Sequence, residues 1–288
     1  MNASDTNTAT VTSYYGFDLD ATVPTTIDNR VITGFGILQP VFNPVAFGGV
    51  VPTNVTLPGA LTSIGNEAFL DCAGIQAITI PAGVTNIGSM AFEGCTDLTN
   101  IVIPDAVSNL EGSAFEACTS LRTVTIGVGV AAIRGNTFSI CSNLVTVTVV
   151  GNVTNIASSA FGSCPRLSSI YFHGNAPAVS SNVFFGVTAY YLPDTIGWDA
   201  FSAISGAQAV LWNPTIQTGG ANFGIQNSQF GFNITATNNI SVVVEASANP
   251  AGPLWSPLQT VTLTNGSFYF SEPLQPGSSG RYYRLSPP

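Results

Sequence analysis

The chain has 288 residues, and only 7% of them are charged, with 15 acidic residues against 6 arginines and a formal net charge of −9. Soluble domains usually carry about 25% charged residues. Because the arginines are scattered singly, no basic patch could bind a row of phosphates, which excludes nucleic-acid binding, and the single histidine, His173, excludes a histidine-based metal cluster.

Residues 1–54 are expected to form an N-terminal cap. The first ten residues lack the basic start and the apolar stretch of an export signal, and no apolar run reaches the ~20 residues of a membrane span. The segment VITGFG, from Val31, could form a degenerate strand one repeat period before Val55. Asp18, Asp20 and Asp28 could hold calcium, but their spacing lacks the glycine and the terminal glutamate of a calcium loop, so we predict no metal site.

Residues 55–195 repeat with a period of 23. All five cysteines follow this step, at Cys72, Cys95, Cys118, Cys141 and Cys164. Six phenylalanines form a second column with the same step: Phe69, Phe92, Phe115, Phe138, Phe161 and Phe184. Independent columns that share one period are typical of a solenoid, in which each repeat forms one coil.

Each repeat begins with alternating apolar residues, as in Leu98 to Ile103, which predicts a short half-buried strand. Pro81 and Pro104 end two of these strands, and Gly88 and Gly112 favour a tight turn into a short helix on the opposite side of the coil. A single repeat has too small a core to fold alone. The sequence therefore predicts a solenoid with a parallel β-sheet, short helices and stacked coils.

The repeats resemble the BspA-like leucine-rich repeat family, whose unit reads roughly I-x-I-P-x-x-V-x-x-I-x-x-x-A-F-x-x-C-x-x-L. The segment from Ile78 to Leu98, ITIPAGVTNIGSMAFEGCTDL, fits at nearly every position, and the resemblance covers about residues 55–191. Departures include Gly127 and Val150 where proline is expected, Thr137 for alanine, and a sixth copy without cysteine. The resemblance implies a bacterial extracellular or surface protein that binds proteins or matrix and has no family-wide catalytic residues.

Residues 196–222 are expected to form a capping helix and a linker, with Trp198 and Phe201 covering the last coil. Residues 223–288 alternate as strands do and predict a small antiparallel β-sandwich, with a hairpin at Asn265-Gly266. This part resembles a C-terminal module of large secreted bacterial proteins, with the matching segments FGFNI, VVVEAS, FYFSEP and RYYRL and an isolated Trp255. That resemblance implies an exported protein whose tail serves sorting or attachment.

Residues that could carry chemistry have simpler structural interpretations. The cysteines are expected to pack as buried free thiols, since no repeat supplies a second ligand for a soft metal and their odd number does not suit redox pairs. His173 follows a strand and is expected in a turn, without a nucleophile motif. Two carboxylates could suffice for a glycosidase, but the acidic residues of the repeats are expected at solvated turns or on the helical side: Glu93, Asp97, Asp105, Glu111 and Glu116. We predict no catalytic residue, no cofactor and no metal.

The outward positions of the repeat strands form an uncharged strip, which we predict to be a partner-binding face. Its residues are Thr79, Asn100, Val102, Thr123, Thr125, Thr146, Thr148 and Tyr171. Desolvating such residues costs less than desolvating charges, although strand propensity alone also favours β-branched residues there. A threonine grid of the ice-binding kind is present in only two adjacent repeats.

Together, the sequence and its resemblances predict a non-enzymatic extracellular or cell-surface protein of a bacterium. It would adhere through this face to a protein, matrix or glycan partner, and its β-sandwich would serve for attachment. A structural subunit that self-assembles into filaments or layers is the first alternative, because the low charge opposes stacking little. A carbohydrate-active protein is the second.

Overall fold

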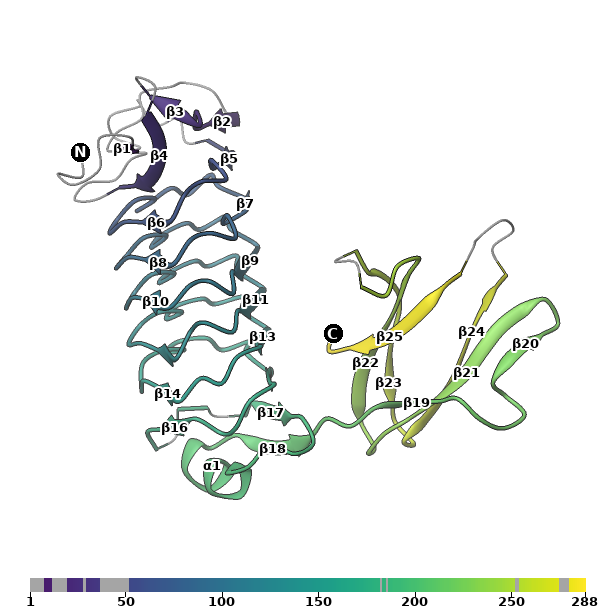
Figure 1. Ribbon diagram of the computed structural model, residues 1–288. Helices are drawn as coiled ribbons and strands as arrows, with labels where there is room; N and C mark the ends of the chain where they lie inside the picture. Colours follow the sequence, from purple (N-terminus) through teal and green to yellow (C-terminus); the bar gives the residue numbers. More distant parts are fainter. Residues whose placement is uncertain are drawn as a thin grey trace. The chain divides into compact units, whose positions relative to one another are not determined.

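The computed structural model of the chain describes residues 8–11, 20–27, 30–36, 52–181, 183–184, 186–251, 254–274 and 280–288 (Figure 1). The chain divides into two compact units, unit 1 (Met1–Val210) and unit 2 (Leu211–Pro288).

Unit 1 is a parallel β-solenoid of about eight turns with a period of about 23 residues. Two ladders of short strands run along it, and the first carries the outward strip that the sequence predicts (Figure 1). The first ladder contains β2 (Asp20–Thr22), β5 (Asn54–Thr56), β7 (Ala77–Ile78), β9 (Asn100–Ile103), β11 (Thr123–Ile126), β13 (Thr146–Val149), β15 (Ser169–Phe172), β17 (Thr188–Tyr191) and β18 (Gln208–Leu211). The second contains β1 (Thr8–Val11), β4 (Arg30–Phe35), β6 (Ser63–Ile64), β8 (Asn86–Ile87), β10 (Asn109–Leu110), β12 (Ala132–Ile133), β14 (Asn155–Ile156) and β16 (Ala178–Val179), and β3 (Thr26–Ile27) pairs antiparallel with β4.

Like residues lie over like in the core of the solenoid, which confirms the predicted columns. The phenylalanine rings form one continuous stack, in which Phe92 lies 4.9 Å from Phe69 and 5.0 Å from Phe115, measured between ring centroids. The last member, Phe184, is tilted by 44° against Phe161. Each coil therefore buries its apolar side chains mainly against the coils before and after it.

The short helix predicted in each repeat is not formed. The residues on that side make consecutive turns instead, and Glu67 and Asp71 have positive φ angles of 57° and 56°, which a right-handed helix does not allow. An α-helix also needs each N–H to bond a carbonyl four residues earlier. Here the N–H of Phe69 donates to the carbonyl of Ala91 in the next coil, at 2.7 Å. Hydrogen bonds between coils therefore replace those within a helix.

The solenoid extends further toward the N-terminus than the predicted repeats. β2 pairs with β5 and continues the first ladder, while β4 pairs with β6 and continues the second. The prediction that the Val31 segment precedes Val55 in one ladder is therefore wrong. Phe35 at the end of β4 stacks on Phe69 at 5.1 Å and adds a ring to the core column.

A single α-helix, α1 (Trp198–Ser205), is found among the described residues and lies at the last coil of unit 1 (Figure 1). Its buried Trp198 stacks on Tyr191 at 4.9 Å and meets Phe172 at 5.1 Å. Phe201 packs edge-on against Trp198 at 5.2 Å and is also buried. These rings cover the apolar end that the last coil would otherwise expose.

Unit 2 consists of two antiparallel sheets. One contains β19 (Thr215–Gln217), β20 (Gly224–Gln226), β21 (Gln229–Thr235) and β24 (Ser267–Pro273), and the other contains β22 (Ile240–Ser247), β23 (Ser256–Leu263) and β25 (Tyr282–Ser286). Their inner faces meet through aromatic rings, since Tyr283 of β25 lies 5.2 Å from Phe230 and 5.3 Å from Phe232 of β21. The five strands of the sequence prediction are present, and β19 and β20 add to them.

The prediction of a hairpin at Asn265-Gly266 is wrong. A turn does form there, but β23 pairs with β22 whereas β24 pairs with β21, so the chain crosses from one sheet to the other. A two-residue hairpin of the predicted kind needs positive φ at both central residues. Only Gly266 has it, at 72°. The crossing lets Leu263 and Phe270 both reach the buried space between the sheets.

Candidate binding face on the parallel sheet

The predicted partner-binding residues lie in two adjacent columns on the outer side of the first ladder. The register places Thr123 opposite Asn100 and Thr146, and Thr125 opposite Val102 and Thr148. Between the two columns, inward-pointing residues such as Val124 are buried in the core. Since strand residues alternate between faces, the sheet presents its hydroxyl, amide and valine side chains together on one side.

Exposure varies along these columns. Thr79, Asn100, Val102 and Thr123 are exposed, whereas Thr125, Thr146 and Thr148 are half-buried. Tyr171 is only 3% exposed, because its ring lies against Tyr190 with 4.7 Å between centroids. Burial also raises the pKa of Tyr171 above its ordinary value, with a further contribution from Tyr190. Of the eight predicted residues, Tyr171 is thus the least accessible to a partner.

The sequence analysis missed several residues of the face, among them Thr22 and Thr56. Thr22 pairs with Thr56, and both are exposed in the column that Thr79 continues. The Asn-x-Thr of residues 54–56 resembles the outward pairs of later repeats and could have revealed Thr56. Thr22 gave no such signal, because 34 residues separate it from Thr56 instead of 23.

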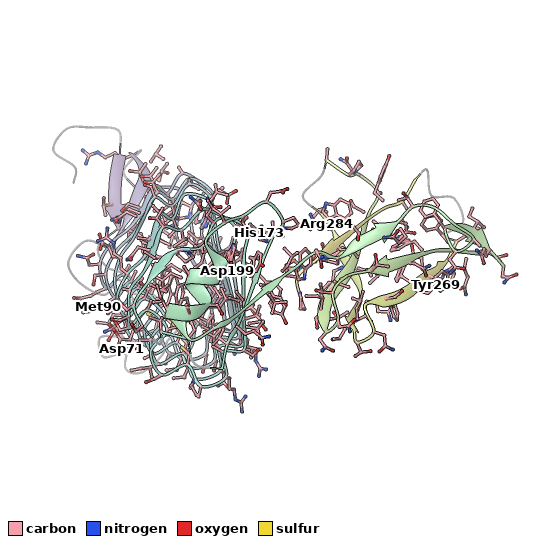
Figure 2. The ribbon with its side chains drawn as sticks, turned by 90° about the horizontal axis from the view of Figure 1, so that it is seen from below. Asp71, Met90, His173, Asp199, Tyr269 and Arg284 are labelled. Carbon is pink, nitrogen blue, oxygen red and sulfur yellow. The ribbon has the colours of Figure 1, made fainter. Side chains whose placement is uncertain are left out.

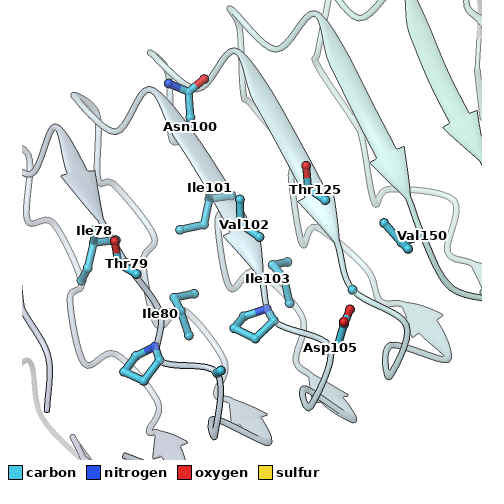
Figure 3. A pocket seen from close by; sticks show the side chains of 14 residues that line it. Ile78, Thr79, Ile80, Asn100, Ile101, Val102, Ile103, Asp105, Thr125 and Val150 are labelled. Atoms are coloured by element: carbon cyan, nitrogen blue, oxygen red, sulfur yellow. The ribbon is translucent and has the colours of Figure 1, made fainter. Parts of the chain in front are cut away.

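A shallow groove of about 580 Å³ crosses the face at β7, β9 and β11 (Figure 3). It lies where the ladder is interrupted, since β7 and β9 belong to separate hydrogen-bonded sheets. Val102 stands within it and is 62% exposed, and Pro81 and Pro104 line the end at which the strands stop. Among the described residues that line the groove, Asp105 alone carries a charge, and it accepts a hydrogen bond from the N–H of Val128 at 3.1 Å.

The repeats match a known family. The profile of the BspA type leucine-rich repeat region fits six copies over residues 62–190. Residues 62–190 are therefore similar to the BspA type leucine-rich repeat family. The expected resemblance is therefore confirmed over the central part of the chain, including β6 through β16 and the groove.

Several solved structures are similar to this chain at low sequence identity, with TM-scores below 0.5. A leucine rich repeat protein of T. pallidum is 24% identical, with a TM-score of 0.46, over 56% of this chain and 83% of that one. A leucine rich cell surface protein of Faecalibacterium prausnitzii is 23% identical, with a TM-score of 0.47, over 72% of each chain. The pneumococcal vaccine antigen PcpA is 17% identical, with a TM-score of 0.46, over 68% of this chain and 42% of that one. The comparison with curated proteins found no match.

The remaining candidate residues of the BspA type repeats lie apart from the groove, with the exception of Asp105. Asp71 and Met90 lie on the side of the coil that is formed by consecutive turns, which we call the turn side. His173 lies on the opposite side (Figure 2). Glu93 lies on the turn side, where burial and then the charge of Glu116 raise its pKa. His173 occupies a bend after β15, as predicted, and burial lowers its pKa. Within the described residues no cluster of three or more His, Cys, Asp or Glu could hold a metal ion.

Two further predictions concern carboxylates. Glu111 pairs with Arg134 at 2.9 Å, and Asp97 is exposed, so both lie at the solvated surface as expected. The possible calcium ligands Asp18 and Asp28 lie outside the described residues.

No helix in the described part of the chain is both long enough and apolar enough to cross a bilayer.

The cysteines form a ladder of free thiols inside the BspA type repeats. The thiol of Cys95 donates to the carbonyl of Phe69 at 3.2 Å, and that of Cys118 donates to Phe92 at 3.2 Å. These two thiols thus each satisfy a turn carbonyl of the preceding coil. Four of the five are buried, as predicted, whereas Cys164 is half-buried at the end of the ladder.

One of the five thiols is expected to react rapidly in the folded protein. Burial raises the pKa of Cys72 to about 12 and raises that of Cys95 and Cys118 above the ordinary value, so few thiolates form at pH 8. The pKa of Cys164 is lowered instead, because the thiol of Cys141 donates to its thiolate. Ellman's reagent at pH 8 should therefore label Cys164 alone, and all five thiols after unfolding.

The Cys164→Ser variant is the control for this labelling. It should lose the fast reaction and keep its melting temperature within a few degrees. Fast labelling of two or more thiols, or an unchanged rate in the variant, would show that the ladder is open to solvent.

Proposed function

We propose that the chain is an extracellular bacterial surface protein that binds a protein partner through the outer face of its repeat sheet. The similarity of residues 62–190 to the BspA type repeats supports a surface role. The observation that carries the binding proposal is Val102, an exposed apolar side chain inside a groove on a nearly uncharged face. Contact centres of protein interfaces are depleted of charged residues and use such apolar anchors.

The geometry of the face lowers the cost of binding. Its outward side chains include β-branched residues, Thr79, Val102 and Thr125, with few rotamers to lose. Val102 and Thr125 stand on β9 and β11, which pair with each other in register, so the backbone there needs no ordering. Since hydroxyl and amide groups form hydrogen bonds without the desolvation cost of a charge, the face suits a partner whose contact surface is also weakly charged.

The outward residues offer contact and no acid–base chemistry. Hydroxyl, amide and valine side chains of ordinary reactivity neither donate nor accept protons readily near pH 7. Asp105 at the groove end lines it together with apolar neighbours such as Val150. We therefore propose an adhesive and non-enzymatic role.

Self-assembly is the second candidate, favoured by the net charge of only −9 over 288 residues and by the uncharged face. It predicts regular polymers of the purified chain, whereas adhesion to another protein predicts a monomer. Sedimentation velocity at rising protein concentration separates the two.

A charge placed in the groove should weaken adhesion strongly. We expect the full chain to bind at least one of immobilised fibronectin, laminin and collagen, and Val102→Asp to weaken this binding at least about tenfold, because a buried unpaired carboxylate is costly. Biolayer interferometry measures the dissociation constants.

The matched control is Ile140→Asp, on the turn side. Ile140 is 44% exposed and occupies the repeat position at which the first repeat has Asp71, so the same change should be tolerated there. Equal binding by Val102→Asp and the unchanged chain, equal loss in the control, or no binding to any of the three matrix proteins would contradict the proposal.

A further inference from the structure

A second surface, in unit 2, combines amide and hydroxyl side chains with one exposed aromatic ring. It is the outer face of the sheet formed by β19, β20, β21 and β24. The register brings the outward residues into rows, for example Gln217, Asn233 and Tyr269 in one row and Thr215, Thr235 and Ser267 in the next. We call this surface the amide face, and its side chains are Thr215, Gln217, Gln226, Gln229, Asn233, Thr235, Ser267, Tyr269 and Ser271.

Tyr269 lies flat across the amide face because its neighbour on β21 is a glycine. A Cβ at Gly231 would collide with the phenol of Tyr269, so only glycine lets the ring rest on the backbone there. The ring stays 41% exposed, and Figure 2 labels it on unit 2. An aromatic ring held against a sheet with one side open is a platform on which a flat ligand can pack.

The polar side chains around the ring are already held by hydrogen bonds. Gln217 donates from Nε2 to the hydroxyl of Thr235 at 2.7 Å, and the hydroxyl of Ser271 donates to Oε1 of Gln229 at 2.9 Å. Each of these groups keeps further donor or acceptor capacity. The amide face therefore offers fixed hydrogen-bonding groups on both sides of the platform, which reduces the entropy lost on binding.

The amide face is neutral, whereas the outer face of the other sheet is charged. The one carboxylate in the described strands of the amide-face sheet, Glu272, is opposite Phe230 on the inner side and bonds Tyr283. On β25 and β22 of the other sheet, Arg284 and Glu245 form an ion pair at 2.6 Å. The neutral face is thus complementary to an uncharged ligand.

We propose that the amide face binds a neutral polysaccharide, with Tyr269 as its stacking platform. One face of a pyranose ring presents C–H groups, which pack on an aromatic ring, while its hydroxyls both donate and accept hydrogen bonds. The amides of Gln217, Gln229 and Asn233 match this need, since each offers a carbonyl and an NH₂ group. This site is separate from the groove at Val102, so the test of this proposal does not depend on the adhesion proposed for the repeats.

Affinity electrophoresis of the full chain tests the proposal. The chain migrates in native gels because of its net charge of −9. We expect hydroxyethylcellulose, barley β-glucan or xylan in the gel to slow it, and polygalacturonate not to. Tyr269→Ala should raise the apparent dissociation constant at least about tenfold, as removal of an aromatic anchor does, whereas Tyr269→Phe should keep most of the affinity.

Tyr282→Ala is the matched control. Tyr282 is 46% exposed and lies on β25 of the charged sheet, so its loss should leave the retardation unchanged. Thermal melting checks that each variant folds, and Asn233→Ala, which leaves the Tyr269 ring in place, should weaken retardation severalfold if Tyr269→Ala proves unstable. Absence of retardation by all three neutral glycans, equal retardation of Tyr269→Ala, or equal loss in Tyr282→Ala would overturn the proposal and leave Tyr269 as a cover for Gly231.

Discussion

Replacing Phe115 by alanine is expected to destabilise unit 1 by about 3–5 kcal/mol. Phe115 is fully buried, and its ring lies between Phe92 at 5.0 Å and Phe138 at 5.5 Å. Its removal opens a cavity in the middle of the stack. Since each coil rests only on its neighbours, the coils on both sides lose contact at once. Urea unfolding of the full chain, followed by circular dichroism, measures the change.

The control for this effect is Thr125→Ala on the outer face of the next coil. Thr125 is half-buried and lies outside the apolar core, so its replacement should change the free energy of unfolding by less than about 1 kcal/mol. Equal losses in the two variants would mean that the inner and outer faces of the repeats have been assigned wrongly.

Replacing Trp198 by alanine is expected to cost a similar amount, about 3–5 kcal/mol, and to expose the end of the solenoid. The indole stacks on Tyr191, contacts Phe172 and donates from Nε1 to the hydroxyl of Thr195 at 2.9 Å. Solenoid ends need protection because their apolar ladders have no further coil to cover them. We therefore expect a lower melting temperature together with concentration-dependent association in sedimentation velocity.

Ile204→Ala is the control on the same helix. Ile204 is an exposed apolar residue of α1, so the helix keeps its contacts with the last coil when this side chain is shortened. The variant should melt near the unchanged chain and remain monomeric. A Trp198→Ala protein that melts with the control would show that α1 does not cap the solenoid.

The repeat fold could be predicted because the sequence period is also the structural period. Each position in the coil is occupied by the corresponding residue of every 23-residue repeat. The phenylalanine and cysteine columns therefore predicted the stacking of Phe92 on Phe115. The alternation of Asn100 to Ile103 likewise gave the outward and inward faces of β9. These features depend only on the positions of apolar side chains along the chain.

Features that depend on pairing between distant segments could not be predicted. The missing short helices follow from positive φ at non-glycine residues such as Glu67 and from hydrogen bonds to the next coil. The crossing at Gly266 depends on which sheet each strand joins, whereas the Asn-Gly signal reports only the local turn. Tyr171 was expected to be accessible, and its stacking on Tyr190 depends on a sixth coil that is shorter than the period.

The candidate sites, too, could be predicted from the sequence only in part. The outward strip, including Val102, follows from alternation, but the groove around it needs the two prolines at the strand ends and the interruption between β7 and β9. The amide face depends on Tyr269 crossing to Gly231, a diagonal contact between strands that the sequence alone does not fix.

Carbene footprinting of the full chain, with and without a bound matrix protein, tests most directly whether the repeat sheet is the contact surface. Our account predicts that the partner suppresses labelling of Val102 and of the neighbouring peptides that carry Thr79 and Thr125, while labelling of Ile140 on the turn side stays unchanged. Suppression at Ile140 with full labelling of Val102 would contradict it.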